Sequence, residues 1–337
     1  MLFFGDPSHS KVSLAGYLSG SPLFVLWSGT FAVYVFFVLS GFVISASAAS
    51  TQFTLSNSLA RRYLRLVIPM LASAVIAFGM VSALPNAVQT AANLSGNFWL
   101  GFFYQNLMSL PEVIVETAGP VFLQVDSTIN AVFWTMRYEL IGSFAIYFYY
   151  AVFRKRTALV IPALAILILL WAPYGWGNLS GSPIGLLLFE AWKSGRLQKL
   201  APAAMLMIFA RLWLGGQPYS TSTSLFAWLI DAFPLSHQQS GRSVGAGLSF
   251  LGVLMSPLAR SLLCSAVPQF LGRISFGLYL LHLPLLLTAL CAGYIASPQL
   301  LPMMIVLYVM TAFGLGYLFT RLVDEPVVKM LPRLLKQ

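Results

Sequence analysis

The chain has 337 residues, of which 58% are hydrophobic and 8% are charged, and its mean hydropathy is +0.82. A soluble domain carries about 25% charged residues, so this composition excludes an ordinary water-soluble protein. The formal net charge of +10 does not indicate a nucleic-acid partner, because the basic residues stand in short clusters beside apolar runs. The sequence therefore predicts an all-α, polytopic membrane protein whose first partner is the lipid bilayer.

Nine apolar segments are candidates for membrane spans, and the fifth is too short for a full crossing. In chain order they cover residues 23–46, 66–84, 133–153, 157–174, 182–192, 199–216, 244–259, 274–295 and 300–320. The aromatic-rich residues 93–110 lack the length of a span and fit an interfacial or re-entrant piece. The chain is thus predicted to have a short tail over residues 1–22, a transmembrane domain over 23–322 and a second tail over 323–337.

The charges predict the orientation of this bundle. If the spans alternate sides, most Lys and Arg residues fall on one side, and cytoplasmic loops collect these residues. The C-terminal tail is then cytoplasmic and the N-terminal tail is not, although residues 1–22 contain no segment that would carry that end across. We therefore expect either a further helix upstream or a first span that inserts as a reverse anchor. The sequence specifies neither the cellular membrane nor the oligomeric state.

Arg61, Arg62 and Arg65 form a basic cluster just before the second predicted span. Arg61 and Arg65 share one helical face, with Arg62 about 100° around the helix. Arg forms bidentate hydrogen bonds with phosphate, so the cluster is a candidate phosphate site. A topology signal that contacts lipid phosphates would explain the same residues.

Trp134, Arg137 and Glu139 open the third predicted span. Ionised side chains within an apolar segment are costly, which makes them candidates for function. Arg137 and Glu139 are two residues apart and point about 200° away from each other, so each is expected to find a partner on another helix. Alternatively, Arg137 reaches water at the interface by snorkelling.

Tyr279, His282 and Pro284 lie in the predicted span 274–295. A histidine there can accept or donate a proton. Pro284 frees a backbone carbonyl one turn upstream, near Leu280, which is typical of a kink around a cavity. The alternative for His282 is a packed side chain bonded to nearby backbone.

Glu325 follows the last predicted span. It is expected to pair with the basic surface nearby, including the Arg61 to Arg65 cluster, or to end a helix before Pro326.

Cys264 and Cys291 lie in apolar segments without the spacing of a zinc site and are expected in the core. The sequence lacks GxSxG, Walker, HExxH and Rossmann fingerprints, so we expect no metal and no bound cofactor.

Four segments, in this order, resemble the membrane acyltransferase-3 family. They are Phe36–Ile44 (FFVLSGFVI), Arg61–Arg65 (RRYLR), Trp134–Glu139 (WTMRYE) and Gly272–His282 (GRISFGLYLLH), which is followed by Glu325-Pro326. Each motif alone is weak, but the ordered set is fairly specific and covers about residues 30 to 330. The resemblance implies a bundle of ten spans, which fits nine spans here plus one upstream.

The resemblance also implies an enzyme that moves an acyl group from an acyl-CoA-type donor to a hydroxyl of a carbohydrate, lipid or other small acceptor. It assigns the donor phosphates to Arg61, Arg62 and Arg65. It implies catalytic roles for Glu139 and His282 in a central cavity. The other motif residues would line or support that cavity: Trp134, Arg137, Tyr279 and Glu325.

The expected general base of this family is a His on the first helix, and His9 does not match it because it is not on an apolar helix. The sequence is therefore interpreted as an incomplete form of an active acyltransferase or as a non-catalytic remnant. A small-molecule transporter is the alternative class, since broken helices and intramembrane charges occur there as well.

Overall fold

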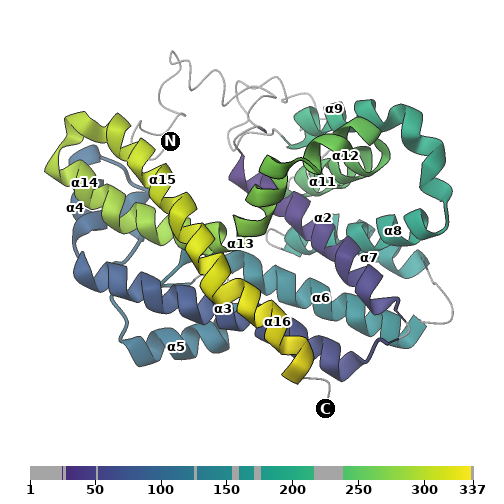
Figure 1. Cartoon of the computed structure of the whole chain (residues 1–337), viewed down its shortest axis with the longest axis horizontal. Coiled ribbons are helices and arrows are strands. Elements are labelled where there is room, and N and C mark those ends of the chain that lie inside the picture. Colours follow the sequence, from purple (N-terminus) through teal and green to yellow (C-terminus); the bar gives the residue numbers. More distant parts are fainter. Residues whose placement is uncertain are drawn as a thin grey trace. The chain divides into compact units, whose positions relative to one another are not determined.

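A computed structural model describes residues 25, 28–50, 52–124, 127–153, 159–170, 176–215 and 238–334. Regular secondary structure in these residues is entirely helical (Figure 1), which confirms the predicted all-α class. The predicted tail over residues 1–22 lies outside the described part. The α-helices are α2 (Gly29–Ala48), α3 (Leu55–Ala83), α4 (Ala87–Ser95), α5 (Leu110–Ala118), α6 (Trp134–Phe153), α7 (Val160–Leu170), α8 (Gly181–Lys193), α9 (Ala204–Gly215), α11 (Gln238–Met255), α12 (Pro257–Leu263), α13 (Ala266–Leu285), α14 (Cys291–Ala296), α15 (Leu301–Phe319) and α16 (Glu325–Leu334).

Four helical runs of the described residues are long and apolar enough to cross a membrane. They are Gly29–Ala48, Leu55–Ala83, Ala266–Ala296 and Pro298–Leu334. The bent pair α11 and α12 makes a fifth if it is counted as one span. The predicted spans 157–174, 182–192 and 199–216 correspond to α7, α8 and α9, which have 11, 13 and 12 residues. The count of nine is not confirmed, and it stays a prediction because 171–175 and 216–237 lie outside the described residues.

The predicted span 244–259 is broken at Ser256, where α11 and α12 meet at 93°. The backbone of Ser256 is extended, and its hydroxyl accepts a hydrogen bond of 3.2 Å from the amide of Ala259. Pro257 is the first residue of α12. The N–H of a first helical residue has no carbonyl partner within the helix, so proline is tolerated there. Cys264, at the end of α12, is exposed, so its expected place in the core is wrong, whereas Cys291 is buried.

The chain divides into two compact units, each built from separated stretches of sequence. Of the described residues, unit 1 contains those within 60–137 and 265–334, and unit 2 contains those within 25–59 and 138–264. Two divisions fall within α3 and α6, and another falls between α12 and α13.

In unit 1, α13 packs against α15, and α4 packs against α14. Gly277 permits the first contact, because a Cβ atom there would lie 2.7 Å from the carbonyl oxygen of Gly316. The second contact belongs to a buried apolar cluster that includes Val81, Tyr104 and Cys291. The C-terminal half of α3 is thereby joined to α4 and α14.

The segment that contains α5 lies beside α3. The hydroxyl of Tyr63 on α3 donates a hydrogen bond of 2.5 Å to the carbonyl of Ala118, and its ring lies 5.9 Å from that of Phe122. The connection after α3 therefore folds back along a candidate span. The residues that do so are those around 110–122, beyond the re-entrant piece predicted over 93–110.

In unit 2, α2 packs against α8, and α11 packs against α9 and α2. Gly181 and Gly185 are four residues apart on α8 and face α2. A Cβ atom on Gly185 would lie 2.2 Å from the carbonyl oxygen of Val38, and one on Gly41 would lie 2.4 Å from that of Ser182. The two backbones are thus in direct contact, as is typical of membrane helix pairs with small residues at the interface.

Candidate functional site

His282 lies on α13 and is partly buried, three residues after Tyr279. Its Nδ1 atom is 2.8 Å from the carbonyl oxygen of Tyr279 and 3.2 Å from that of Leu278. A carbonyl oxygen can only accept, so Nδ1 carries the proton and donates it. In the neutral imidazole Nε2 is then the acceptor. The backbone of α13 itself therefore selects the tautomer whose Nε2 can accept a proton from a ligand.

Pro284 causes the predicted break in helical hydrogen bonding. It has no N–H for the carbonyl of Leu280, and the Nδ2 atom of Asn130 donates to that carbonyl instead, at 2.8 Å. Asn130 is 1% exposed, and its Oδ1 accepts from the amide of Val132 at 3.4 Å. A π-helical turn over Leu286–Leu290 follows. Sequence reasoning identified the freed carbonyl and missed Asn130, although a freed carbonyl in a span requires a donor from elsewhere.

Tyr279 connects the His282 motif to the start of α6. Its hydroxyl donates to the carbonyl of Val132 at 3.0 Å and lies 2.9 Å from the hydroxyl of Thr135. Trp134 and Arg137 are partly buried on the same first turn of α6. Unit 1 therefore brings together two motifs that are about 145 residues apart in the sequence.

Arg65 forms an ion pair with Asp324 on the π-helical turn Thr320–Asp324. Both terminal nitrogens of its guanidinium engage the carboxylate, the Nη2–Oδ2 contact at 3.3 Å, and the guanidinium carbon lies 5.5 Å from the centre of the Phe276 ring. Arg65 thus connects α3 to α13 and to the end of α15. Arg61 and Arg62 lie one turn earlier on α3 and are partly buried.

Glu325 pairs with a different part of the basic surface from the one expected. Its carboxylate lies 2.5 Å from Arg273, 3.3 Å from Arg321 and 3.9 Å from Lys329. The expectation of a basic partner is confirmed, but the carboxylate that pairs with Arg65 is Asp324. Asp324 is not among the site residues predicted from the sequence.

Replacing Arg65 with glutamine is expected to lower the free energy of unfolding by about 2 kcal/mol, because Asp324 is 10% exposed and would lose its cation. The Asp324→Asn change should recover part of this loss in the double variant. Thermal melting of the full chain in nanodiscs would measure the coupling between the two changes. As a matched control, Lys329→Gln should cost under about 0.5 kcal/mol, because Lys329 is 74% exposed. Additive effects of the Arg65 and Asp324 changes would contradict this assignment.

Glu139 lies in unit 2, where it is 2% exposed. The hydroxyl of Ser40 on α2 donates to its Oε1 atom, and the rings of Phe37 and Tyr138 lie 6.2 Å apart beside this contact. The expected partner on another helix is thus confirmed for Glu139. Ser40 belongs to the first of the four motifs, so unit 2 joins the first and third motifs.

Unit 2 also buries polar groups that sequence reasoning missed. Glu190 on α8 is 7% exposed and accepts a hydrogen bond from the hydroxyl of Tyr150. Asn178 accepts one from Tyr34, and Arg242 is 3% exposed on α11. Glu190 stands alone in an apolar stretch, which is the signal that could have identified it.

Comparison with known proteins assigns the chain to a family. The model of a family described as an acyltransferase domain matches residues 2–321. No curated protein and no solved structure matches the chain significantly. The family match covers the four motifs from Phe36 to His282 and ends before Glu325-Pro326. The chain therefore belongs to the acyltransferase-3 family of membrane acyltransferases.

Proposed function

We propose that this protein transfers an acyl group from an acyl-CoA-type thioester to a hydroxyl of a carbohydrate, lipid or other small acceptor. In this reaction the hydroxyl oxygen attacks the thioester carbonyl, the C–S bond breaks, and an ester and a free thiol form. The hydroxyl proton must pass to a base and finally to the departing thiolate. Family membership supports the reaction class.

The observation that most favours this function is the orientation of His282. Its Nδ1 proton is held by the carbonyls of Leu278 and Tyr279, which leaves Nε2 as the acceptor that a substrate hydroxyl requires. Within the same unit, the hydroxyls of Tyr279 and Thr135 lie close to this helix turn. We propose that His282 orients the acceptor hydroxyl or assists its proton transfer, and that Glu139 has a catalytic role in unit 2.

For the donor, we propose that Arg61 and Arg62 contribute most of the phosphate contacts. Arg65 was expected to share this role, but its guanidinium is engaged by Asp324, so its contribution is proposed to be smaller. Acyl-CoA is thus a donor substrate in this proposal and not a resident cofactor.

We also propose a multi-pass arrangement of nine spans over residues 23–322 with a cytoplasmic C-terminal tail. The apolar segments of the sequence and the one-sided Lys and Arg clusters support it. The donor would then reach the Arg61 and Arg62 side from the cytoplasm.

Replacing His282 with asparagine is expected to reduce ester formation about 100-fold or more, because the variant loses the acceptor at the Nε2 position. The asparagine amide can still donate to the carbonyls that Nδ1 contacts, so the melting temperature should change little. The assay supplies membranes that contain the full chain with acyl-labelled acetyl-, octanoyl- or palmitoyl-CoA and measures base-labile label.

A His282→Gln variant, whose amide reaches the Nε2 position, serves as the matched comparison and should retain more activity than the asparagine variant. Equal activity of parent and both variants would contradict the role of His282. If no thioester gives labelled ester, the acyl-CoA donor is wrong and the transporter or remnant interpretation is favoured.

A further inference from the structure

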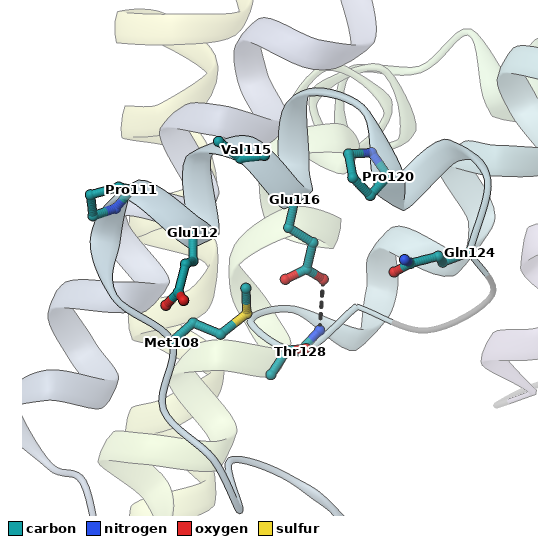
Figure 2. A pocket seen from close by; sticks show the side chains of 8 residues that line it. All are labelled: Met108, Pro111, Glu112, Val115, Glu116, Pro120, Gln124 and Thr128. Carbon is teal, nitrogen blue, oxygen red and sulfur yellow. Dashed lines mark hydrogen bonds between the residues drawn. The ribbon is translucent and has the colours of Figure 1, made fainter.

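A pocket of about 450 Å³ lies beside α5 in unit 1 (Figure 2). Four apolar side chains form much of its wall: Met108, Pro111, Val115 and Pro120. Glu112, Glu116, Gln124 and Thr128 complete the lining. In Figure 2 the carboxylates of Glu112 and Glu116 extend from the same side of α5, toward Met108 and Thr128.

Glu116 is 7% exposed, and only one of its carboxylate oxygens has a hydrogen-bond donor. Oε1 accepts from the amide of Thr128 at 2.9 Å, while Oε2 is buried without a partner. A carboxylate oxygen can accept about two hydrogen bonds, and an unsatisfied buried oxygen is costly. Glu116 lines the pocket, so a rotation of its carboxylate would offer this acceptor to a ligand with an N–H or O–H group.

The acidic lining of the pocket disfavours anionic ligands. Glu112 lies one turn before Glu116, and its carboxylate accepts hydrogen bonds of 2.7 Å from the amide and hydroxyl of Ser109. These hydrogen bonds lower the pKa of Glu112, so it stays ionised near neutral pH. The lining contains no Lys, Arg or His. Such a pocket repels the phosphates of an acyl-CoA donor.

A metal ion fits the pocket poorly. Within the described ranges, no group of three or more His, Cys, Asp or Glu side chains could hold a metal ion. Apolar walls also suit an organic group better than a hydrated ion. An organic cation with N–H donors meets all three conditions: the missing hydrogen bond, the negative charge and the apolar wall.

We propose that this pocket binds a protonated primary amine that carries an apolar substituent. The ammonium group donates a hydrogen bond to Oε2 of Glu116 and lies near the charge of Glu112. The substituent packs against Met108 and Val115. The amine belongs to a soluble alkylamine or to the headgroup of an aminophospholipid, and its binding does not depend on the acyl-transfer reaction.

The first test titrates the full chain, in phosphatidylcholine nanodiscs, with n-butylammonium chloride at constant ionic strength, and records thermal melting. We expect a saturable rise in melting temperature. The apparent affinity should fall at least tenfold in Glu116→Gln and severalfold in Glu112→Gln, which keeps its hydrogen bonds to Ser109. The Gln124→Glu variant adds a negative charge and should bind more tightly, which tests the proposal even if Glu116→Gln fails to fold.

Two results would overturn the proposal. One is equal affinity of the parent and both glutamine variants for n-butylammonium. The other is an equal effect of n-butanol, which would assign the pocket to hydroxyl recognition. Nanodiscs that contain phosphatidylethanolamine distinguish an aminophospholipid headgroup from a soluble alkylamine. A bound headgroup would weaken the apparent affinity of the protein for n-butylammonium. An unchanged affinity would assign the site to a soluble amine.

Discussion

Replacing Gly185 with alanine is expected to lower the free energy of unfolding by about 3 kcal/mol, at the upper end of the cost of overpacking. The new Cβ atom would lie 2.2 Å from the carbonyl oxygen of Val38 and 2.6 Å from the amide nitrogen of Phe42. Both atoms belong to the backbone of α2, so no side-chain rotation relieves the contact. The helices α2 and α8 must move apart, and this would disturb Ser40, which holds Glu139.

The measurement is the thermal melting of the purified full chain in nanodiscs. The matched control is Gly79→Ala on α3, where a Cβ atom meets nothing within 4 Å. That variant should melt at or slightly above the parent temperature, since alanine favours the helix by about 1 kcal/mol. Equal melting temperatures of the two variants would show that the close contact of α2 and α8 does not determine stability.

The helical class follows from composition and hydropathy, since backbone groups in an apolar solvent must satisfy one another within the helix. The breaks are harder to predict. The span predicted over 244–259 bends at Ser256 because a capping serine and a proline act together. Hydropathy averaged over a window is insensitive to such a pair. The glycines of α8 form a visible pattern, but the sequence does not show which helix they contact.

The sequence motifs identified residues of the candidate site, but they did not identify which side chains contact one another. Ser40 and Glu139 both belong to motifs, and their contact joins two of these segments. Glu325 was expected to pair with the basic surface that includes Arg65, but the carboxylate that pairs with Arg65 is that of Asp324. Asp324 is the last residue of the π-helical turn Thr320–Asp324 and pairs with Arg65, whereas Glu325 begins α16 and pairs with Arg273. The one-dimensional pattern contains no sign of that turn.

Asn130 illustrates why the rest of the site could not be read from sequence. It stands in a loop without a motif, 150 residues before the carbonyl that it satisfies. A buried asparagine with a distant partner is identified only when the fold brings the two together. Its position links the start of α6 to the helix turn of His282, which makes it a candidate positioning residue.

Replacing Asn130 with alanine is expected to lower the free energy of unfolding by about 1–3 kcal/mol, because the carbonyl of Leu280 would be buried without a donor. The Asn130→Asp variant should be affected more, by about 3 kcal/mol or more, since an uncompensated carboxylate would face that carbonyl. Melting of the full chain in nanodiscs measures both values. In the acyl-transfer assay, both variants should lose activity at temperatures well below their melting points if the helix turn of His282 shifts.

The decisive comparison pairs Asn130→Ala with Pro284→Ala. The Pro284→Ala change restores a backbone N–H that can bond to the carbonyl of Leu280. The Asn130→Ala change should therefore lower the free energy of unfolding by at least about 1 kcal/mol less in the double variant than it does alone. Such coupling arises only if Asn130 acts on the carbonyl that Pro284 frees. Strict additivity would instead mean that Asn130 stabilises the loop before α6, through its bond to the amide of Val132, and that His282 is positioned by its own helix alone.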